Sequence, residues 1–267
     1  MAIYSDFAAL YDAAMSETPY DTWTKRIVDL FGKTVSPGDL VCELGSGTGE
    51  ITLRLSELGY DMIGIDNSEE MLNLAKDKLY SVLDGDGEEE EEELPEPPVL
   101  FLKQDMRSFE LFGTVRAFVS VCDSLNYMEN TEELTKVFRL VNNYLDKDGI
   151  FLFDVKTEYF FRSVCGNSTR TEEIENDMLI WENEYNPVQK KNHYRLTMFR
   201  ETGDGSYRRS SEDHVQTAFS EEEIRQALSE SGLILTDIIR DFREEGDPEP
   251  ERLLFVAKEG YQEGKLY

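Results

Sequence analysis

The sequence predicts an α/β fold: a doubly wound, mostly parallel sheet of seven strands, with an antiparallel β insertion after the fifth strand. Up to residue 155, short apolar runs alternate with segments of helical periodicity, which is the pattern of consecutive βαβ units. From 156 to 218 the segments become rich in aromatic and β-branched residues separated by polar turns, which is typical of antiparallel strands.

Two helices are expected before the first strand. The first has apolar residues at helical spacing between Phe7 and Ala14, with Ser5 as its N-cap. The second has them between Tyr20 and Phe31. A turn at SPGD, 36–39, then leads to the first strand.

The parallel core follows. Asn67 and Ser68 are expected to cap the helix after the second strand, and Thr131 to open the helix before the fifth. The core strands are predicted at 40–44, 61–66, 99–105, 117–123 and 147–155.

Three antiparallel strands are predicted in the insertion, within 177–186, 191–201 and 209–219. The next helix has Ser220 and Glu223 at capping-box spacing and Gly232 as its stop. The last two apolar segments, 233–242 and 252–259, are predicted to close the main sheet as a hairpin.

The composition of the chain argues against several classes of binding partner. The net charge of −29 repels nucleic acid, so a nucleic-acid partner is not expected. No apolar run is long enough to span a membrane and no secretory leader is evident. Three widely spaced cysteines favour a reducing, cytoplasmic location and no metal site. The acidic stretches 85–98 and 244–251 are interpreted as solvated loops.

The stretch VCELGSGTGE at 41–50 places Gly45, Gly47 and Gly49 directly after the first strand. Ligands bind at the carboxyl ends of strands in sheets of this Rossmann-like kind, and glycine lets a ligand approach the backbone closely. A tight loop without a ligand, a dinucleotide site and a site for another nucleotide-like cofactor all remain open on the glycines alone.

Acidic residues follow the next two strands. Asp66 ends the second strand and can accept hydrogen bonds from both hydroxyls of a ribose. Asp105 ends the third and is followed by Met106, a pair suited to the exocyclic amine and the ring of an adenine. One adenosine would touch all of these positions.

The spacing of the glycines helps to decide which kind of cofactor the loop would bind. The loop reads G-x-G-x-G, whereas the dinucleotide fingerprint reads G-x-G-x-x-G. Glu43 lies just before the loop, where it would repel a pyrophosphate and attract a cation. The sulfonium and amino groups of S-adenosylmethionine therefore fit better, and a dinucleotide-dependent oxidoreductase is disfavoured.

At these residues the chain resembles the class I S-adenosylmethionine-dependent methyltransferases. Their successive motifs resemble ELGSGTGE, GIDNSEEML, LKQDMRSF, VCDSLNYM and LDKDGIFLFDV, all within 39–155. The resemblance implies S-adenosylmethionine as the cofactor. The residues expected to contact it are Tyr11, Tyr20, Trp23, Glu43, Gly45, Gly47, Gly49, Asp66, Asn67, Asp105, Met106 and Cys122.

Within that family the chain is most similar to small-molecule enzymes of the sugar-amine and glycine N-methyltransferase types. This likeness implies that Tyr11, Tyr20 and Trp23 close over the methionine end of the cofactor; core packing is the alternative. The expected activity is methylation of a small molecule at an amine or a hydroxyl. Methylation of RNA or protein, and cofactor binding without catalysis, are the alternatives.

Catalytic candidates come from the segment after the fourth strand and from the insertion. Asp123 would hold an amine or act as a base, unless it only orders its loop, and Tyr127 would face the pocket. His193 and His214 are the only histidines, and either could serve as a base, with a structural or exposed role as the alternative; His193 is taken as the catalytic candidate. The chain then divides into helices and cofactor-binding core (1–155), a substrate lid (156–218) and the C-terminal part of the core (219–267).

Overall fold

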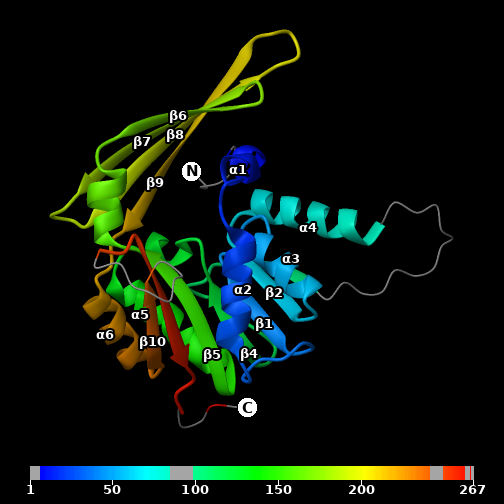
Figure 1. Cartoon of the computed structure of the whole chain (residues 1–267), viewed down its shortest axis with the longest axis vertical. Helices are drawn as coiled ribbons and strands as arrows, with labels where there is room; N and C mark the ends of the chain where they lie inside the picture. The colour runs from blue at the N-terminus through cyan, green and yellow to red at the C-terminus, as the bar shows by residue number, and fades with distance from the viewer. Residues whose placement is uncertain (1–6, 85–98, 241–248, 262–264, 266–267) are drawn as a thin grey trace.

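A seven-stranded sheet forms the body of the protein in a computed structural model that describes residues 7–84, 99–240, 249–261 and 265 (Figure 1). The strand order is β10-β11-β5-β4-β1-β2-β3; β11 is antiparallel to both of its neighbours, β10 and β5, and the other pairs are parallel. This confirms the predicted fold class, including the closing hairpin. The strands are β1 (Leu40–Leu44), β2 (Asp61–Asp66), β3 (Val99–Lys103), β4 (Val115–Ser120), β5 (Leu145–Lys156), β10 (Ile234–Arg240) and β11 (Arg252–Lys258).

Helices cover both faces of this sheet because its inner strands are apolar on both sides. Along β5, Phe151 and Phe153 pack into one core, and Ile150 and Leu152 into the other. The first core also contains α5 (Thr131–Tyr144) and α6 (Glu221–Ser231); the second contains α2 (Tyr20–Phe31), α3 (Glu50–Glu57) and α4 (Glu69–Asp84).

The helix ends follow the predicted capping. Ser220 and Glu223 form a reciprocal capping box, and Gly232 ends α6 with φ of 81°. The Ser68 hydroxyl accepts a hydrogen bond from the N–H of Met71 at 3.2 Å, which caps α4. Ser5 and most of the two acidic stretches lie outside the described residues.

A second, four-stranded antiparallel sheet rises from the main body, as Figure 1 shows. Its strands are β6 (Thr169–Ile174), β7 (Asp177–Asn186), β8 (Lys191–Glu201) and β9 (Tyr207–Thr217), and they lie between β5 and α6 in the chain. The prediction of three strands was wrong: β6 is a largely exposed edge strand with the polar sequence TRTEEI. A short π-helix, η2 (Phe160–Cys165), was not predicted either.

One face of the second sheet is buried. Side chains alternate along a strand, so Tyr194, Leu196 and Met198 of β8 share a face. They pack against Phe7 and Leu10, at and within α1 (Ala8–Ala14). The N-terminal helix therefore lies against the second sheet rather than on the main one.

Asn126 joins the two sheets. It lies in η1 (Ser124–Tyr127), just after β4. Its Nδ2 donates to the carbonyl oxygens of Lys156 at 3.1 Å and Thr217 at 2.8 Å, and its Oδ1 accepts from the N–H of Lys156 at 2.9 Å. Lys156 ends β5 and Thr217 ends β9, so one fully buried amide holds both ends of the segment that contains the second sheet. The division of the chain into three parts stays a prediction.

Candidate active site

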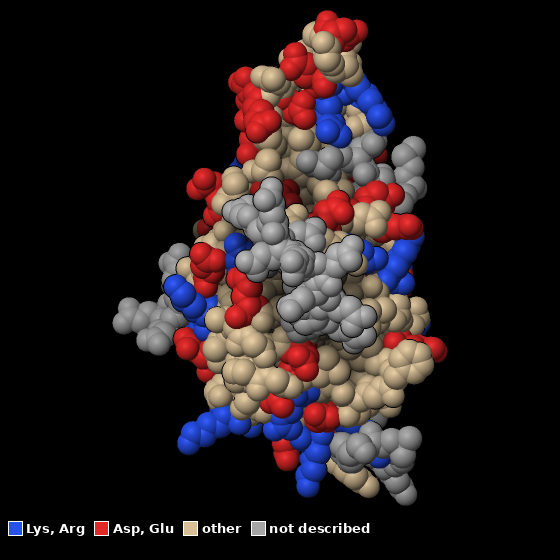
Figure 2. Space-filling model, turned by 90° about the vertical axis from the view of Figure 1, so that its right-hand side faces the viewer, with Lys and Arg blue, Asp and Glu red and all other residues tan. Residues whose placement is uncertain are grey.

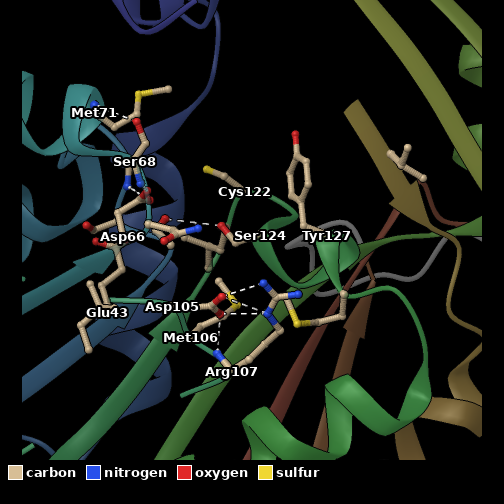
Figure 3. Close-up of a pocket in the computed structure, with 18 of the residues that line it drawn as sticks. Glu43, Asp66, Ser68, Met71, Asp105, Met106, Arg107, Cys122, Ser124 and Tyr127 are labelled. Atoms are coloured by element: carbon tan, nitrogen blue, oxygen red, sulfur yellow. Dashed lines mark hydrogen bonds and ion pairs between the residues drawn. The ribbon is translucent and has the colours of Figure 1, made fainter. Parts of the chain in front are cut away.

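A cavity of about 890 Å³ opens at the carboxyl ends of β1, β2, β3 and β4 and extends beneath the second sheet. Figure 3 shows Asp66 and Ser68 on one side of it and Tyr127 on the other. The predicted site residues that line it are Tyr11, Tyr20, Glu43, Gly45, Gly47, Asp66, Asn67, Asp105, Met106, Cys122, Tyr127 and His193. Trp23, Gly49 and Asp123 are not among its lining residues.

Two of the three glycines in the loop pack so closely against neighbouring atoms that a side chain would not fit without a shift. Gly45 has φ of +74°, and a Cβ on it would lie 2.5 Å from the Ser124 hydroxyl. Gly47, with φ of +52°, has open space around that position. Gly49 serves packing instead: a Cβ there would lie 3.1 Å from Ala75 and 3.2 Å from Phe101. The open side of the loop is thus at Gly47.

Asp66 fastens this loop to β2. Its two carboxylate oxygens accept hydrogen bonds from the N–H groups of Gly47 and Ser68, each at 2.8 Å. Burial raises the pKa of Asp66, while the N–H groups of Ser68, Gly47 and Asn67 oppose that rise. A carboxylate has about four acceptor positions, so capacity remains for ribose hydroxyls.

Glu43 is a buried carboxyl group beneath the loop, 3% exposed. The Thr52 hydroxyl donates to it. Burial raises its pKa to about 8, and nearby Asp66 and Glu50 add to the rise. The free protein therefore holds Glu43 mostly protonated at pH 7, and an incoming cation would favour its ionised form.

Asp105 already has a cationic partner. The Arg107 guanidinium donates to its Oδ1 at 2.9 Å and its Oδ2 at 2.6 Å, and the same side chain reaches Glu133 at 3.0 Å. Its hydrogen bond with Arg107 lowers the pKa of Asp105. Arg107 was not predicted, although its position two residues after Asp105 is the signal that would have revealed it.

The three N-terminal aromatic residues expected at the cofactor lie in two different places. Tyr11 and Tyr20 line the cavity, whereas Trp23 stacks under Arg252, 4.9 Å from the guanidinium carbon to the ring centre. The helix that carries Tyr11 is tied to the glycine loop, because Thr48 donates a hydrogen bond to Asp12 at 2.6 Å. Helix α1 thus covers the loop from the side of the second sheet.

Asp123 belongs to a buried ion cluster. Its carboxylate lies 3.0 Å from Arg252 and 3.4 Å from Lys156, and it accepts from Gln216 at 2.7 Å. Burial raises its pKa, but Lys156 and Arg252 outweigh that effect, and the pKa is lowered overall. Cys122 and Asp123 have φ of 58° and 55°, a strained conformation for non-glycine residues that turns the chain after β4.

Tyr127 and His193 both line the cavity but come from different elements. Tyr127 comes from η1, and its hydroxyl contacts the Tyr194 hydroxyl and lies 3.2 Å from Nδ1 of His214. His193 lies on the exposed face of β8. His214 is buried behind Tyr127, so the two histidines occupy different environments.

The cavity wall under the second sheet consists of alternate residues on two paired strands. Lys191 and His193 of β8 lie opposite Thr217 and Val215 of β9, and Asp213 follows in the same face. This wall was not predicted apart from His193, although the period of two around that residue indicates it.

A family model for the methyltransferase domain matches residues 16–238. The chain belongs to the methyltransferase domain family. It is an S-adenosylmethionine-dependent enzyme. The glycine loop, Asp66 and the Asp105–Met106 pair line one cavity, and their contact with the cofactor stays a prediction. None of the described helices of this methyltransferase has the length and apolar character to cross a membrane.

The similar proteins carry consistent names. "Putative methyltransferase YqeM" of Bacillus subtilis (strain 168) is 36% identical over 258 residues, 96% of this chain and 97% of that one. A solved S-adenosylmethionine-dependent methyltransferase from Clostridium acetobutylicum has a TM-score of 0.81 at 24% identity, covering 97% and 100% of the chains. CalS10 of Micromonospora echinaspora, an amino pentose methyltransferase solved with the cofactor, has a TM-score of 0.68 at 16% identity, covering 97% and 98%.

Proposed function

We propose that this methyltransferase acts on a small-molecule acceptor, at an amine or a hydroxyl. The supporting observation is a single cavity with two different parts: the ends of β1 to β4, and the wall formed by β8 and β9. Its volume of about 890 Å³ is near the upper end for small-molecule pockets, which leaves room for an acceptor beside the cofactor. The structural likeness to an amino pentose methyltransferase agrees with this acceptor class.

Positioning is the main task of the chain in such a reaction. Bound S-adenosylmethionine supplies a methyl group on a positively charged sulfur. Asp66 would hold the ribose, Met106 would pack on the adenine with Asp105 near its amine, and Glu43 would face the cationic end. The wall of Lys191, His193 and Asp213 would orient the acceptor for in-line attack, which lowers the entropic part of the barrier.

The charge distribution disfavours RNA as the acceptor. On the face in Figure 2, acidic side chains occur from top to bottom, and lysine and arginine side chains are scattered in separate groups. Nucleic-acid-binding surfaces instead have lysine and arginine side chains clustered in one patch or stripe. Methylation of a protein stays the alternative, and a cytoplasmic location stays a prediction.

The first experiment is calorimetric titration with S-adenosylmethionine, S-adenosylhomocysteine, NAD and NADP. Micromolar binding of the first two alone is expected. The second is transfer of a radiolabelled methyl group to pooled amines, amino sugars and hydroxyl compounds, with RNA and casein as separate pools. Label in the small-molecule pools supports the proposal, whereas label only in RNA or protein would overturn it. Cofactor binding without transfer to any pool would favour a non-catalytic module.

A further inference from the structure

A buried chain of polar groups leads away from the cavity at Tyr127. The Tyr127 hydroxyl lies 3.2 Å from Nδ1 of His214, and Nε2 of His214 lies 3.3 Å from Oε2 of Glu212. Oε1 of Glu212 accepts a hydrogen bond from the N–H of Phe7 at 2.9 Å. We propose that this Tyr127–His214–Glu212 chain is a proton relay that takes the proton of the methyl acceptor; the proposal rests on the proposed function.

The relay is shielded from water beyond its first member. The side chain of His214 is fully buried and that of Glu212 is 5% exposed. The Tyr194 ring stacks on His214 with centres 4.7 Å apart and planes 5° apart, which fixes the imidazole plane. Only Tyr127 lines the cavity, so it alone is placed to touch an acceptor.

Glu212 sets the tautomer of His214. A carboxylate facing Nε2 is satisfied only if Nε2 carries a hydrogen, so in the neutral ring Nδ1 is the acceptor. Tyr127 therefore donates its hydroxyl hydrogen to Nδ1, and Tyr194 donates to the Tyr127 oxygen. The remaining lone pair of that oxygen can accept a hydrogen bond from an acceptor in the cavity.

Proton transfer along this chain balances the reaction. As the acceptor oxygen or nitrogen bonds to the methyl carbon, the carbon–sulfur bond breaks and its electron pair stays on sulfur. The acceptor proton passes to the Tyr127 oxygen while the Tyr127 proton passes to Nδ1 of His214. The sulfonium charge is lost and an imidazolium appears beside the Glu212 carboxylate, which stabilises it. The proton is later released to water.

His193 has no comparable arrangement. It lies on the opposite face of β8, exposed, in register with Val215. Tyr194, its neighbour in sequence, faces Tyr127 and His214 instead. His214 and Glu212 act through Tyr127 and are thus positioning residues, whereas Tyr127 is the group that contacts the acceptor.

The chain has only two histidines, so ring nitrogen NMR of protein labelled with ¹⁵N-histidine tests the relay without an acceptor. His193→Asn assigns the signals. At pH 7.5 we expect His214 to be neutral with its hydrogen on Nε2, and Tyr127→Phe to shift its Nδ1 resonance. A hydrogen on Nδ1, a doubly protonated ring, or an Nδ1 signal unaffected by Tyr127→Phe would overturn the relay.

Once an acceptor is found, Glu212→Gln separates the relay from a structural role. Glutamine keeps an oxygen that can accept the hydrogen bond from the Phe7 N–H and a side chain of the same size facing His214, but it removes the charge that stabilises an imidazolium. We expect kcat to fall about 10- to 100-fold with cofactor affinity unchanged. The control is Glu182→Gln, an exposed position on β7. An unchanged kcat, or an equal loss of cofactor affinity, would overturn the relay; failure to methylate any acceptor while His214 keeps its tautomer would refute the proposed function instead.

Discussion

The Asp66 carboxylate accepts a hydrogen bond from the Gly47 N–H at 2.8 Å, so the end of β2 holds the glycine loop that follows β1. The same carboxylate is expected to bind the cofactor ribose. Asp66→Ala should weaken S-adenosylmethionine binding about ten- to a hundred-fold for each charge-assisted hydrogen bond lost. Calorimetric titration measures this effect. Asp61→Ala, at the exposed start of β2, is the control, and equal affinity of the two variants would remove Asp66 from the site.

Gly45 and Gly47 provide a matched pair for the steric role of the loop. Both have positive φ, but only at Gly45 does a Cβ collide, 2.5 Å from the Ser124 hydroxyl. In urea unfolding, Gly47→Ala should lower the free energy of unfolding by about 1–2 kcal/mol from its backbone conformation. Gly45→Ala should cost about 1–3 kcal/mol more. Ser124→Gly should recover part of that difference; no recovery would assign the loss to the backbone alone.

Cofactor affinity should depend on pH through Glu43. Its raised pKa of about 8 leaves the carboxyl neutral below that pH, and a bound cation favours the ionised form. Affinity should therefore rise from pH 6 to 8, by at most about tenfold per pH unit, with release of a proton. Titration in buffers of different ionisation enthalpy counts that proton. Glu43→Gln should abolish both effects, and a proton count that survives this substitution would exclude Glu43 as its source.

The same group predicts the pH dependence of stability in the free protein. The folded-state pKa of Glu43, about 8, lies above its ordinary value of 4.5, so the folded state binds the proton more tightly. Its contribution to stability is complete below pH 4.5 and is lost as pH rises through about 8. The unfolding free energy of Glu43→Gln should consequently improve relative to the natural protein between pH 5 and 8. A constant difference across that range would contradict the shift.

Arg252 should be a major determinant of stability. It pairs with Asp123 and with Asp154, whose side chain is fully buried. Arg252→Met leaves both carboxylates without this partner, and removal of one partner from a buried ion pair costs about 3–5 kcal/mol. Arg225→Met breaks an exposed pair with Glu221 and should cost about 0.5 kcal/mol or less. Similar urea midpoints for the two variants would show that the Arg252 cluster adds no stability.

The features that could be predicted from the sequence are those that depend on residues close together in the chain. Strand periodicity placed Gly45, Gly47, Asp66 and Met106 at neighbouring strand ends, because parallel strands end on one edge of the sheet. The capping box of α6 follows from residues three positions apart. Such signals need no knowledge of the strand order.

The remaining features depend on contacts between distant residues. Asp123 was interpreted as a catalytic candidate because it follows β4, yet its partner Arg252 is 129 positions away on β11. Trp23 was expected at the cofactor, with core packing as the alternative, and its ring packs on the same arginine. Edge strand β6 has no apolar alternation, since it packs little against the body. The surroundings of Asp123, Trp23 and β6 are thus set by the tertiary structure, which the local sequence does not reveal.

The amide of Asn126, which bonds to both Lys156 and Thr217, has a consequence for protein engineering. The segment between those two residues leaves and re-enters the body at adjacent points, so it can be exchanged as one cassette with two junctions. A chimaera that takes this cassette from a related enzyme would change the wall facing the acceptor and leave Asp66 and the glycine loop untouched. Acceptor preference could then be recombined independently of the methyl donor, provided that Asn126 stays with the recipient.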